Sequence, residues 1–187
     1  MSDQAETNPP GPPATGERRG FPGEANGWRW LPLTLGVILL DQATKAWIVQ
    51  HFRMYDSIHV LPVLDITLWF NTGAAFSFLA DALGWQKWVF VVLALGVGLA
   101  ILGWLHRLRA RSQAWLCCSL TLILGGALGN VIDRLRMGHV VDFISVHWNR
   151  TYYFPAFNVA DSAITIGAAL LLLDAWRESR SAKKVGV

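Results

Sequence analysis

The sequence predicts an all-α membrane protein, a bundle of four transmembrane helices with a small extracytoplasmic β-sheet segment. Two observations support this prediction. Of the 187 residues, 53% are hydrophobic and only 16% are charged, which is typical of a chain that places most of its side chains in lipid. In addition, four apolar stretches reach the ~20 residues that a helix needs to cross a hydrocarbon core. They cover residues 28–49, 85–105, 114–132 and 157–176.

The first apolar stretch follows a segment, residues 1–27, that is dense in Pro, Gly and polar residues. Such a segment cannot bury enough apolar area to offset its ordering entropy, so we predict a disordered cytoplasmic tail. The stretch after it is long enough to span and lacks a small-residue cleavage site, so we expect an uncleaved first helix. Residues 28–180 then form the transmembrane domain, and residues 181–187 form a second cytoplasmic tail.

The segments between the apolar stretches differ in character. Residues from about 52 to 80 carry the β-branched and aromatic content of strands, with Pro62 and Gly73 as interruptions, and predict a β segment on the outer membrane surface. The short basic sequence HRLRARSQ turns an antiparallel helix pair. The last external segment, about 138–155, is rich in the Trp, Tyr and Phe expected at a membrane interface.

Basic residues fix the expected orientation, because cytoplasmic loops carry an excess of Lys and Arg. The residues that cluster on one side of the spans are Arg18, Arg19, Arg29, Arg107, Arg109, Arg111, Arg177, Arg180, Lys183 and Lys184. We therefore expect both termini in the cytoplasm. The net charge of +3 is explained by this topology, and nothing indicates a nucleic-acid partner.

Neither a disulfide framework nor a metal motif is evident. The two cysteines, Cys117 and Cys118, are adjacent inside one apolar stretch and have no other cysteine to pair with. The five histidines are scattered, without HExxH or CxxC spacing, so we expect no metal and no cofactor. They are His51, His59, His106, His139 and His147. A GxSxG nucleophile elbow is also absent.

Ionisable residues interrupt the apolar stretches at two places. Asp41 and Lys45 are four residues apart and face the same side of the first helix, where they can pair. Charged groups at such depth are candidates for function, although a structural ion pair between helices is the alternative. The third stretch places a small residue, an amide and two opposite charges on one stripe. These residues are Gly126, Asn130, Asp133 and Arg134.

The same helix carries Gly125 and Gly129, a small-xxx-small pair that lets another helix approach closely. Packing is the simpler explanation for the glycines. For the polar members of the stripe, convergence at one membrane edge favours a site, although an Arg near a helix end can also snorkel to the interface.

Two further aspartates, Asp142 and Asp161, flank the last external segment. Asn158 is a good N-cap for the fourth helix, and Asp161 at the third helical position favours the helix dipole. Capping alone does not explain Asp142, which has no local positive partner. A separation of 19 residues can bring the two together, and paired carboxylates share one proton, so one activates water while the other donates to a carbonyl.

Four sequence blocks identify a family that the chain resembles. They are DQATKAW at residues 41–47, FNTGAAFSF at 70–78, GGALGNVIDRLRMGHVVDF at 125–143 and FNVADSAITIG at 157–167. In order and content they resemble bacterial lipoprotein signal peptidase, also called signal peptidase II. Departures are slight: Phe154 stands where a Trp is expected, and the N-terminal tail is long.

The resemblance implies an aspartic endopeptidase of the bacterial inner membrane, with Asp142 and Asp161 as its catalytic dyad near the periplasmic face. It also implies cleavage of prolipoproteins immediately before a diacylglyceryl-modified cysteine, without a metal, by a monomer that contacts membrane lipid. The residues implied to line or support the site are Asn130, Arg134, Asn158, Asn71, Asp41, Lys45, Gly126 and Asp133. Apolar residues such as Phe76, Phe78 and Phe143 are expected to rim a groove that is open to the bilayer.

Three alternatives from other classes remain. A proton-coupled transporter could use Asp41, Asp142 and Asp161 as a relay, but the second apolar stretch contributes no deep polar residue. A presenilin-like protease needs a GxGD motif, which the corresponding sequences GNVID and GHVVD lack. A structural scaffold would leave the paired carboxylates unused.

Overall fold

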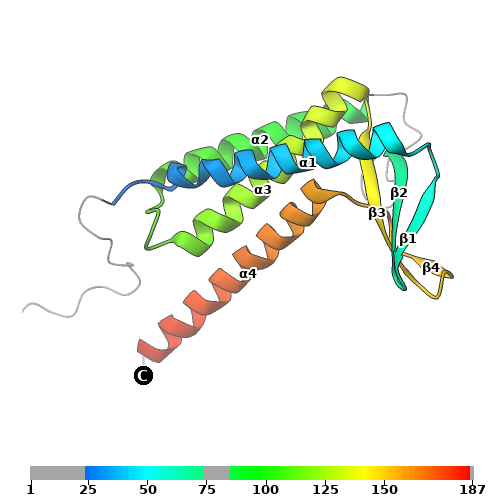
Figure 1. Ribbon diagram of the computed structural model, residues 1–187. Helices are drawn as coiled ribbons and strands as arrows, with labels where there is room; N and C mark the ends of the chain where they lie inside the picture. The colour runs from blue at the N-terminus through cyan, green and yellow to red at the C-terminus, as the bar shows by residue number, and fades with distance from the viewer. Residues whose placement is uncertain (1–23, 74–84, 186–187) are drawn as a thin grey trace, which may run out of the picture.

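The structure is a computed structural model that describes residues 24–73 and 85–185. A 3-10 turn and four long α-helices form a bundle in which α4 slopes away from α1 and α2, and a small sheet lies at one end of the bundle (Figure 1). The helical elements are η1 (Gly27–Trp30), α1 (Leu31–His51), α2 (Gln86–Arg107), α3 (Ala114–Met137) and α4 (Val159–Val185).

Helix α3 is the centre of the bundle and packs against α1, α2 and α4. Its glycines allow this close packing. A Cβ at Gly125 would lie 2.8 Å from Val37 Cβ of α1, and a Cβ at Gly126 would collide with the Ala160 carbonyl oxygen of α4. The close helix approach that the sequence predicted at these glycines is confirmed, because no larger side chain fits without moving a neighbouring helix.

The sheet has four antiparallel strands in the order β1-β2-β3-β4. Strands β1 (Ser57–Leu61) and β2 (Leu64–Asn71) lie in the predicted β segment, whose last residues, from 74 onward, are outside the described part of the chain. Strands β3 (Val140–Trp148) and β4 (Tyr152–Tyr153) come from the segment expected only to carry interfacial aromatics. That segment was misread, because its pairing partner β2 is about 75 residues earlier in the chain.

Three of the helices in the described residues, α2, α3 and α4, are long and apolar enough to cross a membrane. The first predicted span corresponds to α1, which has 21 residues. Its Asp41, Gln42 and Lys45 lower the mean hydropathy of the helix. By length and composition, α1 is therefore not among the candidate spans, and the predicted number of four spans is not confirmed.

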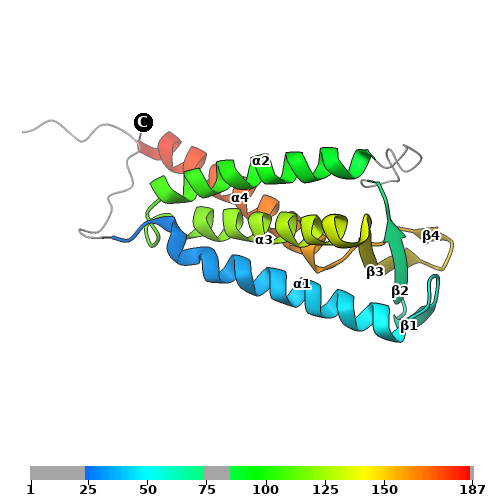
Figure 2. The same cartoon turned by 90° about the horizontal axis from the view of Figure 1, so that it is seen from above.

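Both ends of the described chain lie at the end of the bundle opposite the sheet (Figure 2). Of the predicted N-terminal tail, residues 24–27 are described, and they contact the connection between α2 and α3. Gly27 N donates to Leu108 O over 2.9 Å, and Glu24 accepts from Ser112. At the C-terminus of the chain, α4 continues to Val185, so most of the segment predicted as a C-terminal tail is helical.

Candidate active site

Asp142 lies near the start of β3, shortly after the left-handed turn at Gly138 that ends α3. Its side chain is only 1% exposed. Two amides hold it: Asn71 Nδ2 donates to Asp142 Oδ2 over 3.0 Å, and Asn158 Nδ2 donates to Asp142 Oδ1 over 2.7 Å. The aspartate is therefore a buried carboxylate whose two oxygens are held by neighbours from β2 and from the start of α4.

Asp161 lies in the first turn of α4 and forms a reciprocal cap with Asn158. Asp161 N donates to Asn158 Oδ1 over 2.9 Å, while Asn158 N donates to Asp161 Oδ2 over 3.2 Å. The capping interaction considered from the sequence is confirmed. It leaves Asp161 Oδ1 to accept from Asn130 Nδ2 over 2.7 Å. Asp161 is thus both a helix cap and a member of a polar cluster.

The two aspartates meet through Asn158, which is completely buried. The side-chain oxygen of Asn158 caps α4 beside Asp161, and its amide nitrogen donates to Asp142. Burial raises the pKa of Asp142 to about 7, with a further rise from the charge of Asp161, against the lowering effect of the hydrogen bonds from Asn71 and Asn158. At neutral pH this carboxyl is close to half protonated, which suits a pair that shares one proton.

Arg134 closes one side of this cluster. Its guanidinium donates to Gly73 O over 3.2 Å and lies 4.9 Å from the centre of the Phe90 ring. It also interacts electrostatically with Asp161 and Asp142. The positive charge therefore interacts with both carboxylates over a distance, while the hydrogen bond to Gly73 O and the Phe90 ring hold the guanidinium in place.

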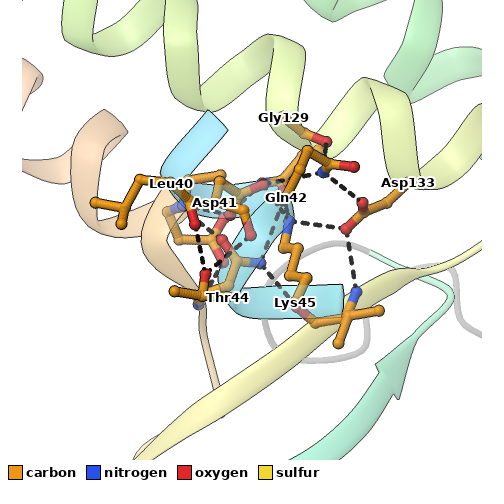
Figure 3. A network of polar contacts seen from close by, with 12 residues as sticks. Leu40, Asp41, Gln42, Thr44, Lys45, Gly129 and Asp133 are labelled. Atoms are coloured by element: carbon orange, nitrogen blue, oxygen red, sulfur yellow. Dashed lines mark hydrogen bonds and ion pairs between the residues drawn. The ribbon is translucent and has the colours of Figure 1, made fainter. Parts of the chain in front are cut away.

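Lys45 is the centre of a second polar network, between α1 and α3 (Figure 3). Its Nζ lies 2.8 Å from Asp41 Oδ2 and 2.7 Å from Asp133 Oδ2, and all three side chains are almost fully buried. The predicted pairing of Asp41 with Lys45 is confirmed. The structural role considered for it is also supported, because the ion pairs join α1 to α3. Gln42 completes the network by donating to Asp133 Oδ1 over 2.8 Å.

The two networks are connected at the start of α4. Lys45 Nζ donates to Asn130 Oδ1 over 3.0 Å, and the same Asn130 holds Asp161. Asp41 Oδ1 accepts from Ala160 N, one of the free N–H groups of the first helical turn, over 2.9 Å. Asp41 and Lys45 on α1 therefore help to position the first turn of α4, which carries Asp161.

An apolar groove of about 360 Å³ is lined by Ala43, Thr44, Trp47, Ile48, Ile66 and Phe143. Phe143 follows Asp142 in β3, and successive side chains of a strand point to opposite faces, so the groove lies on the face of β3 opposite to the Asp142 carboxylate. The predicted rim residue Phe143 is therefore found there. Phe76 and Phe78 lie outside the described residues.

Comparison with known proteins identifies the family. The family described as Signal peptidase (SPase) II matches residues 33–177. Lipoprotein signal peptidases of Pseudomonas aeruginosa and Pseudomonas putida are each 53% identical over 153 residues, or 81% of this chain and about nine-tenths of theirs. The chain belongs to the signal peptidase II family. It is therefore a protease, and the family resemblance predicted from the four sequence blocks is confirmed.

Solved structures agree with this assignment. A bacterial membrane enzyme determined at 2.3 Å resolution by the in meso method superimposes with a TM-score of 0.72 at 29% sequence identity. The match covers 83% of this chain and 92% of that enzyme. The arrangement of helices and sheet described above is therefore that of a known membrane enzyme.

Hydrogen bonds and ion pairs connect the polar site residues named from the sequence into one continuous network, and Gly126 packs against Ala160 beside it. Sequence reasoning missed Gln42, which lies beside Asp41 in the DQATKAW block. It also missed the strand that carries Asp142. The available signal for that strand was the alternation in the sequence HVVDFISVHW. In the structure most residues of β3 are buried.

Proposed function

We propose that this signal peptidase II is a lipoprotein signal peptidase of the aspartic type. It removes signal peptides from prolipoproteins by cleaving before the diacylglyceryl-modified cysteine, with Asp142 and Asp161 as the catalytic dyad. The single observation that best supports this assignment is the shared Asn158, which holds one carboxylate and caps the helix that carries the other. The names of the Pseudomonas relatives support the substrate class.

The chemistry follows from one proton shared by two carboxyl groups. The ionised member takes a proton from water, whose oxygen forms a bond to the carbonyl carbon of the scissile peptide. The protonated member gives its proton to the carbonyl oxygen. The C–N bond then breaks: the protonated member gives its proton to the leaving amino group of the lipidated cysteine, while the ionised member takes a proton from a hydroxyl of the tetrahedral intermediate, which leaves a carboxylic acid and restores the single shared proton. A pKa of about 7 for Asp142 keeps both protonation states accessible at neutral pH.

The other site residues have distinct supporting roles in this proposal. Asn71 and Asn158 orient Asp142, while Asn130 orients Asp161. Arg134 interacts with both carboxylates over a distance and, through its bond to Gly73 O, holds the chain just after β2. Such hydrogen-bonded supports keep a reacting pair in its productive geometry.

The remaining residues act on the helices themselves. Asp41, Lys45 and Asp133 fix α1 against α3, and Gly126 permits the close approach of α4. The apolar groove beside Phe143 suits the acyl chains of the lipidated cysteine and contact with membrane lipid. Because all of these contacts lie within one chain, we expect the monomer to be active.

The proposed topology has four spans, with α1 as the first and both termini in the cytoplasm. The charged groups of α1 are paired inside the bundle, so they do not prevent the helix from lying in lipid. Arg107, Arg109 and Arg111 lie at the end opposite the sheet, in agreement with a cytoplasmic location for that end. The dyad then lies near the periplasmic face of the inner membrane, where a translocated signal peptide arrives.

The test is cleavage of a diacylglyceryl-modified prolipoprotein by the purified protein. We expect the wild-type protein to cleave immediately before the lipidated cysteine, also when a chelator is present. Asp142→Asn and Asp161→Asn should both fall to background, because each removes one member of the proton-sharing pair. Mass spectrometry of the product locates the cleaved bond.

Asp56→Asn is the matched control, because Asp56 is an exposed carboxylate on the sheet side of the molecule. It should cleave at the wild-type rate. Circular dichroism and gel filtration establish that each variant is folded. If a folded Asp142→Asn or Asp161→Asn variant keeps full activity, the dyad assignment is wrong, and that aspartate serves only as a cap or structural group.

A further inference from the structure

We propose that His59, Asp65 and His147 form a binding site for a divalent transition-metal ion such as Zn²⁺, separate from the aspartate dyad. The ligand atoms of these three side chains all lie within 4.8 Å of one another. His59 Nδ1 and His147 Nε2 both contact Asp65 Oδ1, the second over 3.2 Å. They are the one such group of His, Cys, Asp and Glu side chains among residues 24–73 and 85–181.

The sheet brings the three residues together from three neighbouring strands. His59 on β1 is the direct cross-strand partner of Asp65 on β2. His147 on β3 is positioned by its backbone N–H, which donates to Val63 O over 2.9 Å. Because the backbone pairing already fixes all three positions, little conformational entropy remains to be lost when an ion binds. The scattered spacing of these histidines in the sequence hid this arrangement.

The type of ligand points to zinc or a similar ion. Two imidazole nitrogens and one carboxylate oxygen form a set that Zn²⁺ accepts, with a fourth position left for water. Zinc–ligand bonds of ~2.0–2.1 Å place the ligand atoms of a tetrahedral site about 3.4 Å apart. His147 Nε2 and Asp65 Oδ1 are 3.2 Å apart, close to that spacing, whereas His59 Nδ1 is in direct hydrogen-bond contact with the same oxygen and has to draw back from it when an ion enters. Mg²⁺ and Ca²⁺ require more oxygen ligands than the cluster offers.

Burial and charge also favour a cation. Asp65 and His147 are 2% and 4% exposed, whereas the His59 side chain is half exposed and leaves a path for an ion to enter. A carboxylate binds a metal ion in its ionised form, and its negative charge offsets part of the charge of the ion.

The ion would replace the hydrogen bonds that both histidines make to Asp65 Oδ1, and one further contact must change. His147 Nδ1 accepts from Arg150 N over 3.3 Å, so the ring proton of the metal-free protein lies on Nε2. A metal on Nε2 moves that proton to Nδ1, and the Arg150 N–H must then turn away. The hydrogen bond is long, and Arg150 lies in an exposed turn with a backbone φ of 56°. The turn is thus the part of the site that has to adjust.

The site should act on the sheet rather than on peptide cleavage. His147 is five residues beyond Asp142 on β3, which is ~16 Å along an extended strand. A bound ion would tie β1, β2 and β3 together, because each strand supplies one ligand. This proposal is independent of the proposed function, since metal binding and peptide cleavage use different residues and are measured separately.

The experiment is a Zn²⁺ titration of the untagged, full-length protein in detergent, after removal of metal with a chelator. Competition with a chromophoric chelator gives affinity and stoichiometry, and the visible absorption of bound Co²⁺ distinguishes tetrahedral from octahedral coordination. We expect one Zn²⁺ per chain, a Kd below ~10 µM and a tetrahedral cobalt spectrum. Zn²⁺ should also raise the melting temperature of the wild-type protein.

His59→Ala is the main variant, because its exposed side chain can be removed without disturbing the core. It should weaken Zn²⁺ binding at least tenfold and abolish the zinc-dependent rise in melting temperature. Asp65→Asn should do the same as a second variant. His51→Ala is the matched control, since His51 is an exposed histidine at the end of α1, and this variant should bind Zn²⁺ like wild type.

The proposal is overturned if the folded wild-type protein shows no saturable one-to-one binding, or if His59→Ala binds as tightly as wild type. The three residues then form a hydrogen-bonded cluster only.

Discussion

Asn158 Nδ2 lies 2.7 Å from Asp142 Oδ1, while Asn158 Oδ1 accepts from the first turn of α4. A single amide therefore has two roles: its oxygen caps α4, and its nitrogen holds a buried carboxylate of the proposed dyad. The two roles use different atoms of the same side chain. A substitution that keeps the oxygen but removes the nitrogen can separate them.

Asn158→Ser is that substitution. Serine is also a good N-cap, so we expect the variant to fold with α4 intact and to lose less than ~1 kcal/mol of stability through the cap itself. It cannot donate to Asp142 in the same way, so the rate of prolipoprotein cleavage should fall tenfold or more. Thermal denaturation and cleavage kinetics on one preparation measure both effects.

Gln50→Ser is a suitable control for this experiment, because it also replaces an amide with a hydroxyl, at an exposed position near the end of α1. It should leave both stability and cleavage close to wild type. Cleavage by Asn158→Ser at the wild-type rate would show that Asn158 is only a helix cap and would remove it from the set of positioning residues.

Asp142→Asn should change how stability depends on pH. The folded-state pKa of about 7 lies above the unfolded value near 3.9, so the folded protein binds more protons in this interval. Stability from this carboxyl is therefore complete below pH ~4 and is lost as the pH rises through ~7, by at most ~1.4 kcal/mol per pH unit. An Asn at this position has no proton to lose.

Melting temperatures of the detergent-solubilised proteins between pH 5 and pH 8 measure this effect. The melting temperature of wild type minus that of Asp142→Asn should decrease as the pH rises, because only wild type places a charge in the buried site. Asp56→Asn, which alters an exposed carboxylate, should keep a constant difference from wild type. A difference for Asp142→Asn that is also constant would mean that Asp142 titrates at its ordinary pKa in the folded protein.

Lys45→Met should destabilise the bundle strongly. The lysine neutralises Asp41 and Asp133, which are 0% and 1% exposed. Removing one partner of a buried ion pair leaves uncompensated charge and typically costs ~3–5 kcal/mol. Lys87→Met, on the first turn of α2, changes a less buried lysine and should stay within ~0.5 kcal/mol of wild type.

The double variant Lys45→Met/Asp133→Asn identifies the cause of this loss. If uncompensated charge is responsible, neutralising Asp133 should recover part of the stability, and the double-mutant cycle should give a coupling above ~1 kcal/mol. Additive effects, with no recovery, would indicate that Lys45 matters through its packing rather than through its charge. Chemical denaturation in mixed detergent micelles gives the required free energies of unfolding.

The sequence was sufficient to predict the helices and the polar residues of the site, because both have local signals. Apolar stretches of span length mark the helices, and the spacing of Asp41 and Lys45 already places them on one face. The dyad was expected from chemistry and resemblance, and its geometry agrees with a shared amide at Asn158.

The contacts that the sequence did not reveal are those between distant segments. Strand β3 pairs with β2 across about 75 residues, and no local pattern identifies a partner so far away. For the same reason the sequence did not connect His59, Asp65 and His147. The pairing of three strands brings both histidines to Asp65 Oδ1. Gln42 was overlooked because an amide next to an ion pair carries no charge signal of its own.

Gly126→Ala should separate α3 from α4. A Cβ at this position would collide with the Ala160 carbonyl oxygen, which belongs to the first turn of α4. The backbone of α4 must shift to admit the methyl group, at a cost of ~1–3 kcal/mol. Asp161 moves with that turn, so cleavage should fall together with stability.

Gly96→Ala is the matched control, because nothing lies within 4 Å of a Cβ there. It should be neutral or gain ~0.5–1 kcal/mol from higher helix propensity. Thermal denaturation and cleavage assays of both variants measure the contrast, and equal behaviour of the two alanines would mean that α3 and α4 are not held at this contact.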